Sequence, residues 1–219
     1  ELNPNLEIKL SEKIIKNSFI NNFDNNNGRT SFNGNLKKSS KFKFSKIKNF
    51  EYAEPQILFH KSNLIFFDNN GSILKFDNSY KLIWKKNFYK KYEKKLNPLL
   101  SFASNEEILL IADNIAKFYA INIKSGELLW EKKNSSPFNS QVKIYKDKFF
   151  AVDFDNILRC FSIKDGKEIW QFKTEESFIK SQKKLSLLIF NEKIYFNNSL
   201  GDITAVDIKT GNMLWQKPT

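Results

Sequence analysis

The sequence predicts an all-β fold, a β-propeller of four-stranded antiparallel blades, and three observations lead to it. Four similar segments each end in tryptophan, at Trp84, Trp130, Trp170 and Trp215, so the units repeat every 40 to 46 residues. This period fits one four-stranded blade and is too long for ankyrin or leucine-rich repeats. Within each unit, short apolar runs alternate with turn residues, which is typical of strands and hairpins.

Residues 1–50 differ from the repeats, and we expect them to form a leading strand and an Asn-rich connection. The connection is expected at Asn21–Asn35, which contains Gly28 and Gly34. In closed propellers a leading strand commonly completes the last blade and so removes the exposed sheet edges.

The repeats predict four blades in residues 51–219. Their approximate bounds are 51–88, 96–133, 138–173 and 183–219. The last unit shows the pattern best, with strands expected at Lys184–Ile189, Lys193–Phe196, Asp202–Asp207 and Asn212–Lys217. Glycine occurs in the turns between strands, where it adopts the positive φ that other residues resist.

The residues that recur in the units are expected to serve the fold. They are Trp84, Trp130, Trp170, Trp215, Gly126, Gly166 and Gly211. A residue needed once to bind a ligand would appear once, so we expect each indole to fill the gap between successive blades and to donate its N–H to a backbone carbonyl. Asp207 is expected to accept hydrogen bonds from the backbone of the following turn. In the first unit, Tyr80 stands where glycine is expected.

The repeat resembles that of the pyrroloquinoline-quinone-repeat propellers, which has the form Ala-x-Asp-x-x-Thr/Ser-Gly-x-x-x-Trp. The full motif is matched by Ala205, Asp207, Thr210, Gly211 and Trp215. Most of it is matched by Ala120, Ser125, Gly126 and Trp130, and its end by Gly166 and Trp170. The resemblance covers about Asn63 to Thr219. Rings of this family usually have seven or eight blades, so we expect the four blades to be part of such a ring.

Some propellers of this family are quinone-dependent alcohol or sugar dehydrogenases. The resemblance implies that such enzymes hold the quinone with Ca²⁺ on acidic and amide oxygens, beside an Asp base and often a vicinal Cys pair. Here Cys160 is the only cysteine, and His60, expected in a loop between two strands, is the only histidine. We therefore expect no catalytic residue, cofactor or metal site in this chain. A dehydrogenase fragment whose catalytic residues lie in further blades is the alternative.

The closer similarity is to the non-enzymatic branch of the family, the lipoproteins of the outer-membrane β-barrel assembly machinery. In that branch an interblade loop with apolar residues and a basic one docks the periplasmic POTRA domains of the barrel insertase. The loop after Trp170 contains the corresponding candidates Phe178, Ile179, Lys180 and Gln182. The other interpretation is that Phe178 and Ile179 fold back over the blade edge.

The resemblance thus implies a scaffold in the periplasm, associated with the outer membrane through a lipid anchor upstream of Glu1. Its expected partners are the POTRA domains of the insertase and, beyond them, barrel precursors. No run of 18 apolar residues occurs, so we expect no membrane-spanning helix.

The net charge of +12 comes mostly from lysines spread over the whole chain. We expect no nucleic-acid partner, because only Arg29 and Arg159 are arginines and phosphate recognition draws heavily on arginine forks. The segment Phe88–Lys95 interleaves aromatic residues with lysines and is expected to be a solvated interblade loop. Stacking of single-stranded nucleic acid and contact with anionic lipid head groups are the alternatives.

Overall fold

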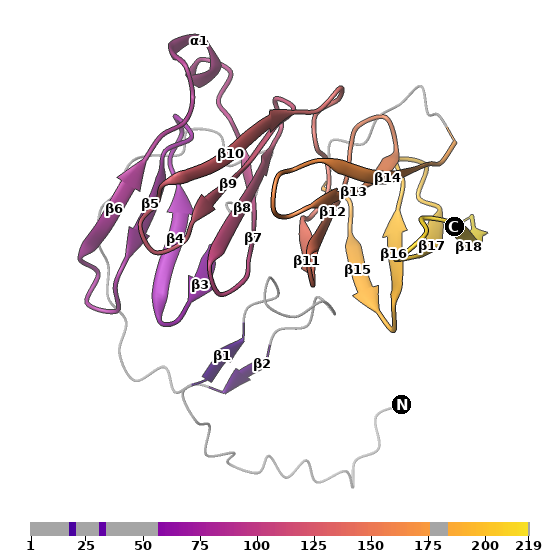
Figure 1. The fold of residues 1–219 in the computed structure, drawn as a ribbon, viewed down its shortest axis with the longest axis horizontal. Helices are drawn as coiled ribbons and strands as arrows, with labels where there is room; N and C mark the ends of the chain where they lie inside the picture. Colours follow the sequence, from indigo (N-terminus) through magenta and orange to yellow (C-terminus); the bar gives the residue numbers. More distant parts are fainter. Residues whose placement is uncertain (1–17, 21–30, 34–56, 176–183, 219) are drawn as a thin grey trace, which may run out of the picture.

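A computed structural model of the chain describes residues 18–20, 31–33, 57–175 and 184–218 (Figure 1). It contains four antiparallel sheets of four strands, and in each sheet the strands follow one another along the chain. The predicted all-β fold of four-stranded antiparallel blades is therefore confirmed. A separate antiparallel pair, β1 (Ser18–Ile20) and β2 (Ser31–Asn33), precedes the blades. The strand β2 lies inside the expected Asn-rich connection. The composition of this segment does not indicate a strand, because β2 forms by pairing with β1, an earlier segment of the chain.

The first blade consists of β3 (Leu58–His60), β4 (Asn63–Phe67), β5 (Ile73–Phe76) and β6 (Leu82–Lys86). The second consists of β7 (Leu100–Ser104), β8 (Ile108–Asp113), β9 (Lys117–Asn122) and β10 (Leu128–Lys133). The third consists of β11 (Lys143–Tyr145), β12 (Lys148–Val152), β13 (Ile157–Ser162) and β14 (Glu168–Lys173). The fourth consists of β15 (Leu187–Phe190), β16 (Lys193–Asn197), β17 (Ile203–Asp207) and β18 (Met213–Lys217).

One short helix, α1 (Lys91–Lys94), lies between the first and second blades. The inner strand of the fourth blade begins at Leu187, three residues after the predicted Lys184. The reason is that Leu185 pairs in parallel with Ser140, which precedes the inner strand of the third blade.

The connections between strands lie at two opposite rims of the blades, as the antiparallel order requires. The hairpin rim carries the turns between the first and second and between the third and fourth strands of each blade. The loop rim carries the turns between the second and third strands, residues 68–72, 113–117, 153–157 and 198–202. It also carries the connections between blades, of which the structure describes residues 87–99, 134–142, 174–175 and 184–186. The inner strand β7 lies against β3 and β11, and β11 lies against β15.

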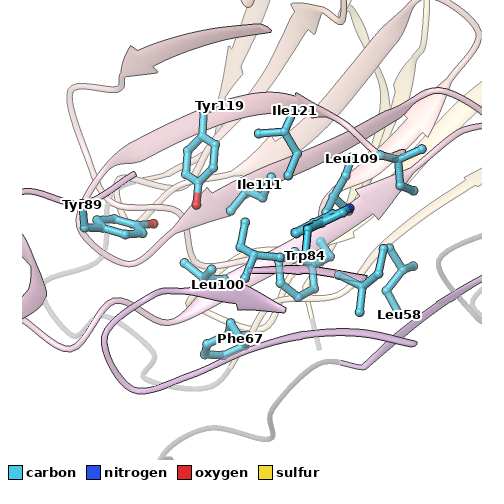
Figure 2. Close-up of a cluster of buried hydrophobic side chains, with 13 residues drawn as sticks. Leu58, Phe67, Trp84, Tyr89, Leu100, Leu109, Ile111, Tyr119 and Ile121 are labelled. Carbon is cyan, nitrogen blue, oxygen red and sulfur yellow. The ribbon is translucent and has the colours of Figure 1, made fainter. Parts of the chain in front are cut away.

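Each pair of adjacent blades shares a buried apolar cluster. Between the first two blades, Phe67 and Trp84 pack with Ile111 and Tyr119 (Figure 2). Similar clusters join the second blade to the third and the third to the fourth. Strands such as β8 are buried on both faces, as expected for a sheet between two neighbouring sheets.

The structure places three of the four recurrent indoles between blades. They differ in whether the indole N–H finds a hydrogen-bond acceptor. Two donate to carbonyl oxygens of the following blade: Trp84 to Lys124 and Trp130 to Ile163, each at 3.0 Å. Trp170 packs in the third cluster, but its N–H has no acceptor among the described residues, contrary to expectation. Trp215, in the last blade, is 41% exposed.

The turns before these tryptophans have the backbone that the repeat implies. Asp207 Oδ1 accepts hydrogen bonds from the backbone N–H groups of Lys209 and Thr210 at 3.0 and 2.8 Å. Gly211 in this turn has a φ of +77°, and Tyr80, at the same place in the first blade, has a φ of +62°. The turn of the first blade is nevertheless one residue shorter, since the N–H of Tyr80 bonds the carbonyl oxygen of Asp77, three residues earlier, whereas that of Gly211 bonds Asp207, four residues earlier.

Candidate functional site

The residues predicted to dock a partner, Phe178, Ile179, Lys180 and Gln182, lie outside the described residues. The described chain on either side of them, at Glu175 and Lys184, belongs to the connection between the third and fourth blades. These flanking residues are part of the loop rim, so the loop rim is the candidate functional site.

One side chain closes the turn between the second and third strands in every blade. These side chains are Asp68, Asp113, Asp153 and Asn198. In each case Oδ1 accepts hydrogen bonds from the backbone N–H groups two and four residues later, at 2.8 to 3.2 Å. Such contacts are typical of Asx turns. The sequence-based prediction overlooked them, although they recur every 40 to 45 residues and so carry the same kind of signal as the tryptophans.

In three blades the same side chain also binds the connection that arrives from the preceding blade. The pairs are Tyr89 Oη to Asp113 Oδ2 at 2.6 Å, Asn134 Nδ2 to Asp153 Oδ2 at 3.2 Å, and Asn198 Nδ2 to Thr174 Oγ1 at 3.5 Å. Each of these three turns therefore stabilises both its own hairpin and the connection that arrives from the preceding blade.

A buried charge cluster supports the first connection. Lys117 Nζ, at the start of β9, lies 3.0 Å from Glu131 Oε1 and 3.6 Å from Glu93 Oε2, and it donates to the Phe88 carbonyl oxygen at 2.5 Å. Burial opposes ionisation of Glu93, but the N–H of Lys90 and the nearby lysine charges outweigh it and lower the pKa of Glu93. The cluster thus keeps charged groups inside the protein by pairing them.

The segment Phe88–Lys95 is consequently only in part the solvated interblade loop that was expected. Tyr89 and Glu93 within it are buried, because their partners Asp113 and Lys117 lie in the hairpin of the next blade. Burial raises the pKa of Asp113 to about 6, even though Tyr89 and two backbone N–H groups donate to its carboxylate.

Arg159, on β13, is buried at the loop rim of the third blade. Its Nε lies 2.7 Å from Asp153 Oδ2, and one terminal nitrogen lies 2.6 Å from Glu168 Oε2 and 2.8 Å from Gln171 Oε1. The other terminal nitrogen lies 3.1 Å from Ser135 Oγ. Since Arg29 lies outside the described residues, no arginine in the described part of the chain presents its fork to solvent.

The candidates for enzymatic chemistry are buried in strands. Cys160 lies in β13, and burial raises the pKa of its thiol to about 12. His60 was expected in a loop, but it is the last residue of β3 and is buried, because the turn begins only at Lys61. Burial and nearby lysine charges lower the pKa of His60.

No three or more His, Cys, Asp or Glu side chains of the described residues form a group that could hold a metal ion. Within the same residues, no helix has the length and apolarity that crossing a lipid bilayer requires.

The chain is similar in sequence to known proteins of one family. A family model described as "Outer membrane protein assembly factor BamB" matches residues 69–219. The outer membrane protein assembly factor BamB of Kangiella koreensis is 24% identical over 110 residues, and the match covers 45% of this chain and 26% of that protein.

Two solved structures share the fold. The crystal structure of BamB from Moraxella catarrhalis has a TM-score of 0.63 and 17% identity, and the match covers 74% of this chain and 48% of that one. The quinohemoprotein alcohol dehydrogenase ADHIIG from Pseudomonas putida HK5 has a TM-score of 0.58 and 14% identity, with 74% and 33% covered. The chain spans less than half of either structure, and identities this low show the fold alone.

Proposed function

The chain belongs to the family of the outer membrane protein assembly factor BamB, and on that premise we propose that it is a scaffold that binds another protein and not an enzyme. The proposed partner is the outer-membrane β-barrel insertase, bound through its periplasmic POTRA domains. Barrel precursors are a further candidate partner. The proposed location is the periplasm, in association with the outer membrane.

The observation that carries this proposal is the set of hydrogen bonds that fix the connections of the loop rim to the blades. The connections between blades are bound to the Asx turns at Asp113, Asp153 and Asn198, and these turns are built into rigid sheets. Loops fixed on a rigid support lose little conformational entropy when they bind a partner, which favours protein recognition. The buried charges of Lys117 and Arg159 are engaged in holding these loops.

Within this rim we propose that Phe178, Ile179, Lys180 and Gln182 contact the partner. Two adjacent apolar side chains beside a lysine suit an interface in which an apolar anchor is surrounded by polar groups. The described residues that flank this segment belong to the same rim as the bound connections, which supports its role as one member of an array.

Co-purification with a POTRA-containing insertase tests the proposal, and the double variant Phe178→Ala/Ile179→Ala localises the contact. A matched control is Leu128→Ala/Leu129→Ala, an exposed apolar pair on β10. We expect the first variant to weaken association by at least about tenfold and the control to leave it unchanged. Equal losses in both variants would place the contact elsewhere.

The alternative function is that of a quinone-dependent alcohol dehydrogenase fragment. Oxidation of an alcohol that depends on added quinone and Ca²⁺, combined with no association with the insertase, would replace the scaffold proposal with this alternative.

A further inference from the structure

Charge is distributed differently on the two rims. On the hairpin rim, lysines pair with exposed carboxylates, as in Lys148–Asp147 at 3.0 Å, Lys167–Asp165 at 3.4 Å and Lys209–Glu192 at 3.0 Å. On the loop rim, the carboxylates of Asp68, Asp113, Asp153 and Glu93 are buried and bind groups inside the protein. Asp155, Glu175 and Asp202 also lie on this rim and are partly or fully exposed, but none of them belongs to the first connection. The lysines of the first connection are therefore the ones least balanced by nearby acids.

The first connection forms the most prominent part of this rim. We call residues Lys90–Leu96 the α1 knob, and Figure 1 shows α1 projecting beyond the strand ends of the first two blades. Its side chains Tyr92 and Leu96 are 55% and 57% exposed. Its four lysines, at positions 90, 91, 94 and 95, reach solvent, and no carboxylate of the described residues lies within 4.0 Å of their ammonium groups.

The knob is fixed to the second blade from inside. Glu93, its only acid, is buried and pairs with Lys117 at 3.6 Å and Lys133 at 3.8 Å. Just before the knob, Tyr89 donates to Asp113 at 2.6 Å. Because the acid points inward, the exposed charge of the knob is entirely positive. Tyr92 and Leu96 lie on the solvent side of the knob, and their exposure contrasts with these inward contacts.

We propose that the α1 knob docks on a membrane surface rich in anionic phospholipids, with its lysines at the phosphates and Tyr92 and Leu96 among the head groups. Lysines beside an anionic membrane attract it strongly, and aromatic and apolar side chains favour the interface between lipid and water. Stacking of nucleic acid fits less well, because Tyr89 is buried and Tyr92 is the one aromatic ring that the knob exposes. This inference does not depend on binding to POTRA domains.

Co-sedimentation of the full chain with vesicles tests the proposal. The vesicles contain either equal parts of phosphatidylglycerol and phosphatidylcholine or phosphatidylcholine alone. The knob variant is Lys90→Gln/Lys91→Gln/Lys94→Gln/Lys95→Gln. The matched control is Lys81→Gln/Lys124→Gln/Lys164→Gln/Lys193→Gln, which removes the same charge from exposed lysines of the hairpin rim, one in each blade. Thermal unfolding verifies that every variant is folded.

We expect the parent chain to bind only the anionic vesicles. The knob variant should lower the partition coefficient at least about tenfold, and the control at most about threefold. Tyr92→Ser/Leu96→Ser should also weaken binding, although the charge is unchanged. Four outcomes would each overturn the proposal. Two concern the vesicles: equal losses of binding in the knob variant and the control, and equal binding of the parent chain to both kinds of vesicle. The others are displacement from the vesicles by inorganic phosphate at matched ionic strength, and binding to an acidic protein with no binding to vesicles.

Discussion

The indole of Trp130 lies directly on Gly166 of the following blade, where an added Cβ atom would stand 2.6 Å from the ring. The same relationship joins Trp84 to Gly126 and Trp170 to Gly211, at 2.9 and 2.7 Å. The two residues that recur most clearly in the sequence thus touch each other across three blade interfaces. Each needs the other for packing, which explains why they recur together.

Gly166→Ala should lower the free energy of unfolding by about 2–4 kcal/mol, because the new methyl group would meet the indole and the backbone has a positive φ. Urea unfolding followed by tryptophan fluorescence measures the change. Tyr80→Ala, at the corresponding turn of the first blade, is the control and should change stability by less than about 1 kcal/mol. Similar losses of unfolding free energy at both positions would contradict a specific clash between the new methyl group and the indole of Trp130.

Replacement of the tryptophans by phenylalanine should destabilise the protein in a definite order. Trp130→Phe removes a hydrogen bond and buried volume and should cost about 2–3 kcal/mol. Trp170→Phe should cost less, because its N–H has no acceptor among the described residues. Trp215→Phe should cost under about 1 kcal/mol, since the side chain is 41% exposed. Equal free-energy losses in urea unfolding would contradict this ranking.

Arg159→Lys should lower the free energy of unfolding by about 2–3 kcal/mol, although it conserves the charge. A lysine cannot reproduce the fork that contacts Asp153, Glu168 and Gln171 together. Glu168→Gln is the comparison and should cost about 1 kcal/mol or less, because the Glu168 side chain is partly exposed. If Arg159→Lys left the free energy of unfolding unchanged in thermal or urea unfolding, the geometry of the arginine fork would not contribute to stability.

Asp113 should make stability depend on pH. Its pKa in the folded protein is about 6, above the value of about 3.9 for an unfolded chain. The folded state therefore holds the proton more tightly, and the stability gained from this is fully present below about pH 4 and is lost as the pH rises through 6. Asp113→Asn should remove this slope. The difference in unfolding free energy between parent and variant, measured from pH 4 to pH 7, should change with pH; a constant difference would exclude a raised pKa.

The architecture could be predicted from the sequence because its signals repeat. Trp84, Trp130 and Trp170 stand at equivalent places, so their spacing gives the length of a blade and their recurrence indicates packing. The Asx turns, such as those at Asp113 and Asp153, carried a comparable signal. They escaped prediction because aspartate is common in turns and only its spacing sets these residues apart.

What could not be predicted depends on contacts between blades. Tyr89 and Glu93 look like members of a solvated, lysine-rich loop, but their partners Asp113 and Lys117 lie more than 20 residues away in the next hairpin. Only the stacking of the blades brings these groups together. His60 was misplaced for a local reason, since β3 has three residues and its end is not marked by a glycine or proline.

Titration of purified POTRA domains with the folded chain, followed by calorimetry, tests the scaffold function most directly. We expect saturable binding that Phe178→Ala/Ile179→Ala weakens by at least about tenfold and that Leu128→Ala/Leu129→Ala leaves unchanged. No binding by the folded parent chain would contradict the proposed function.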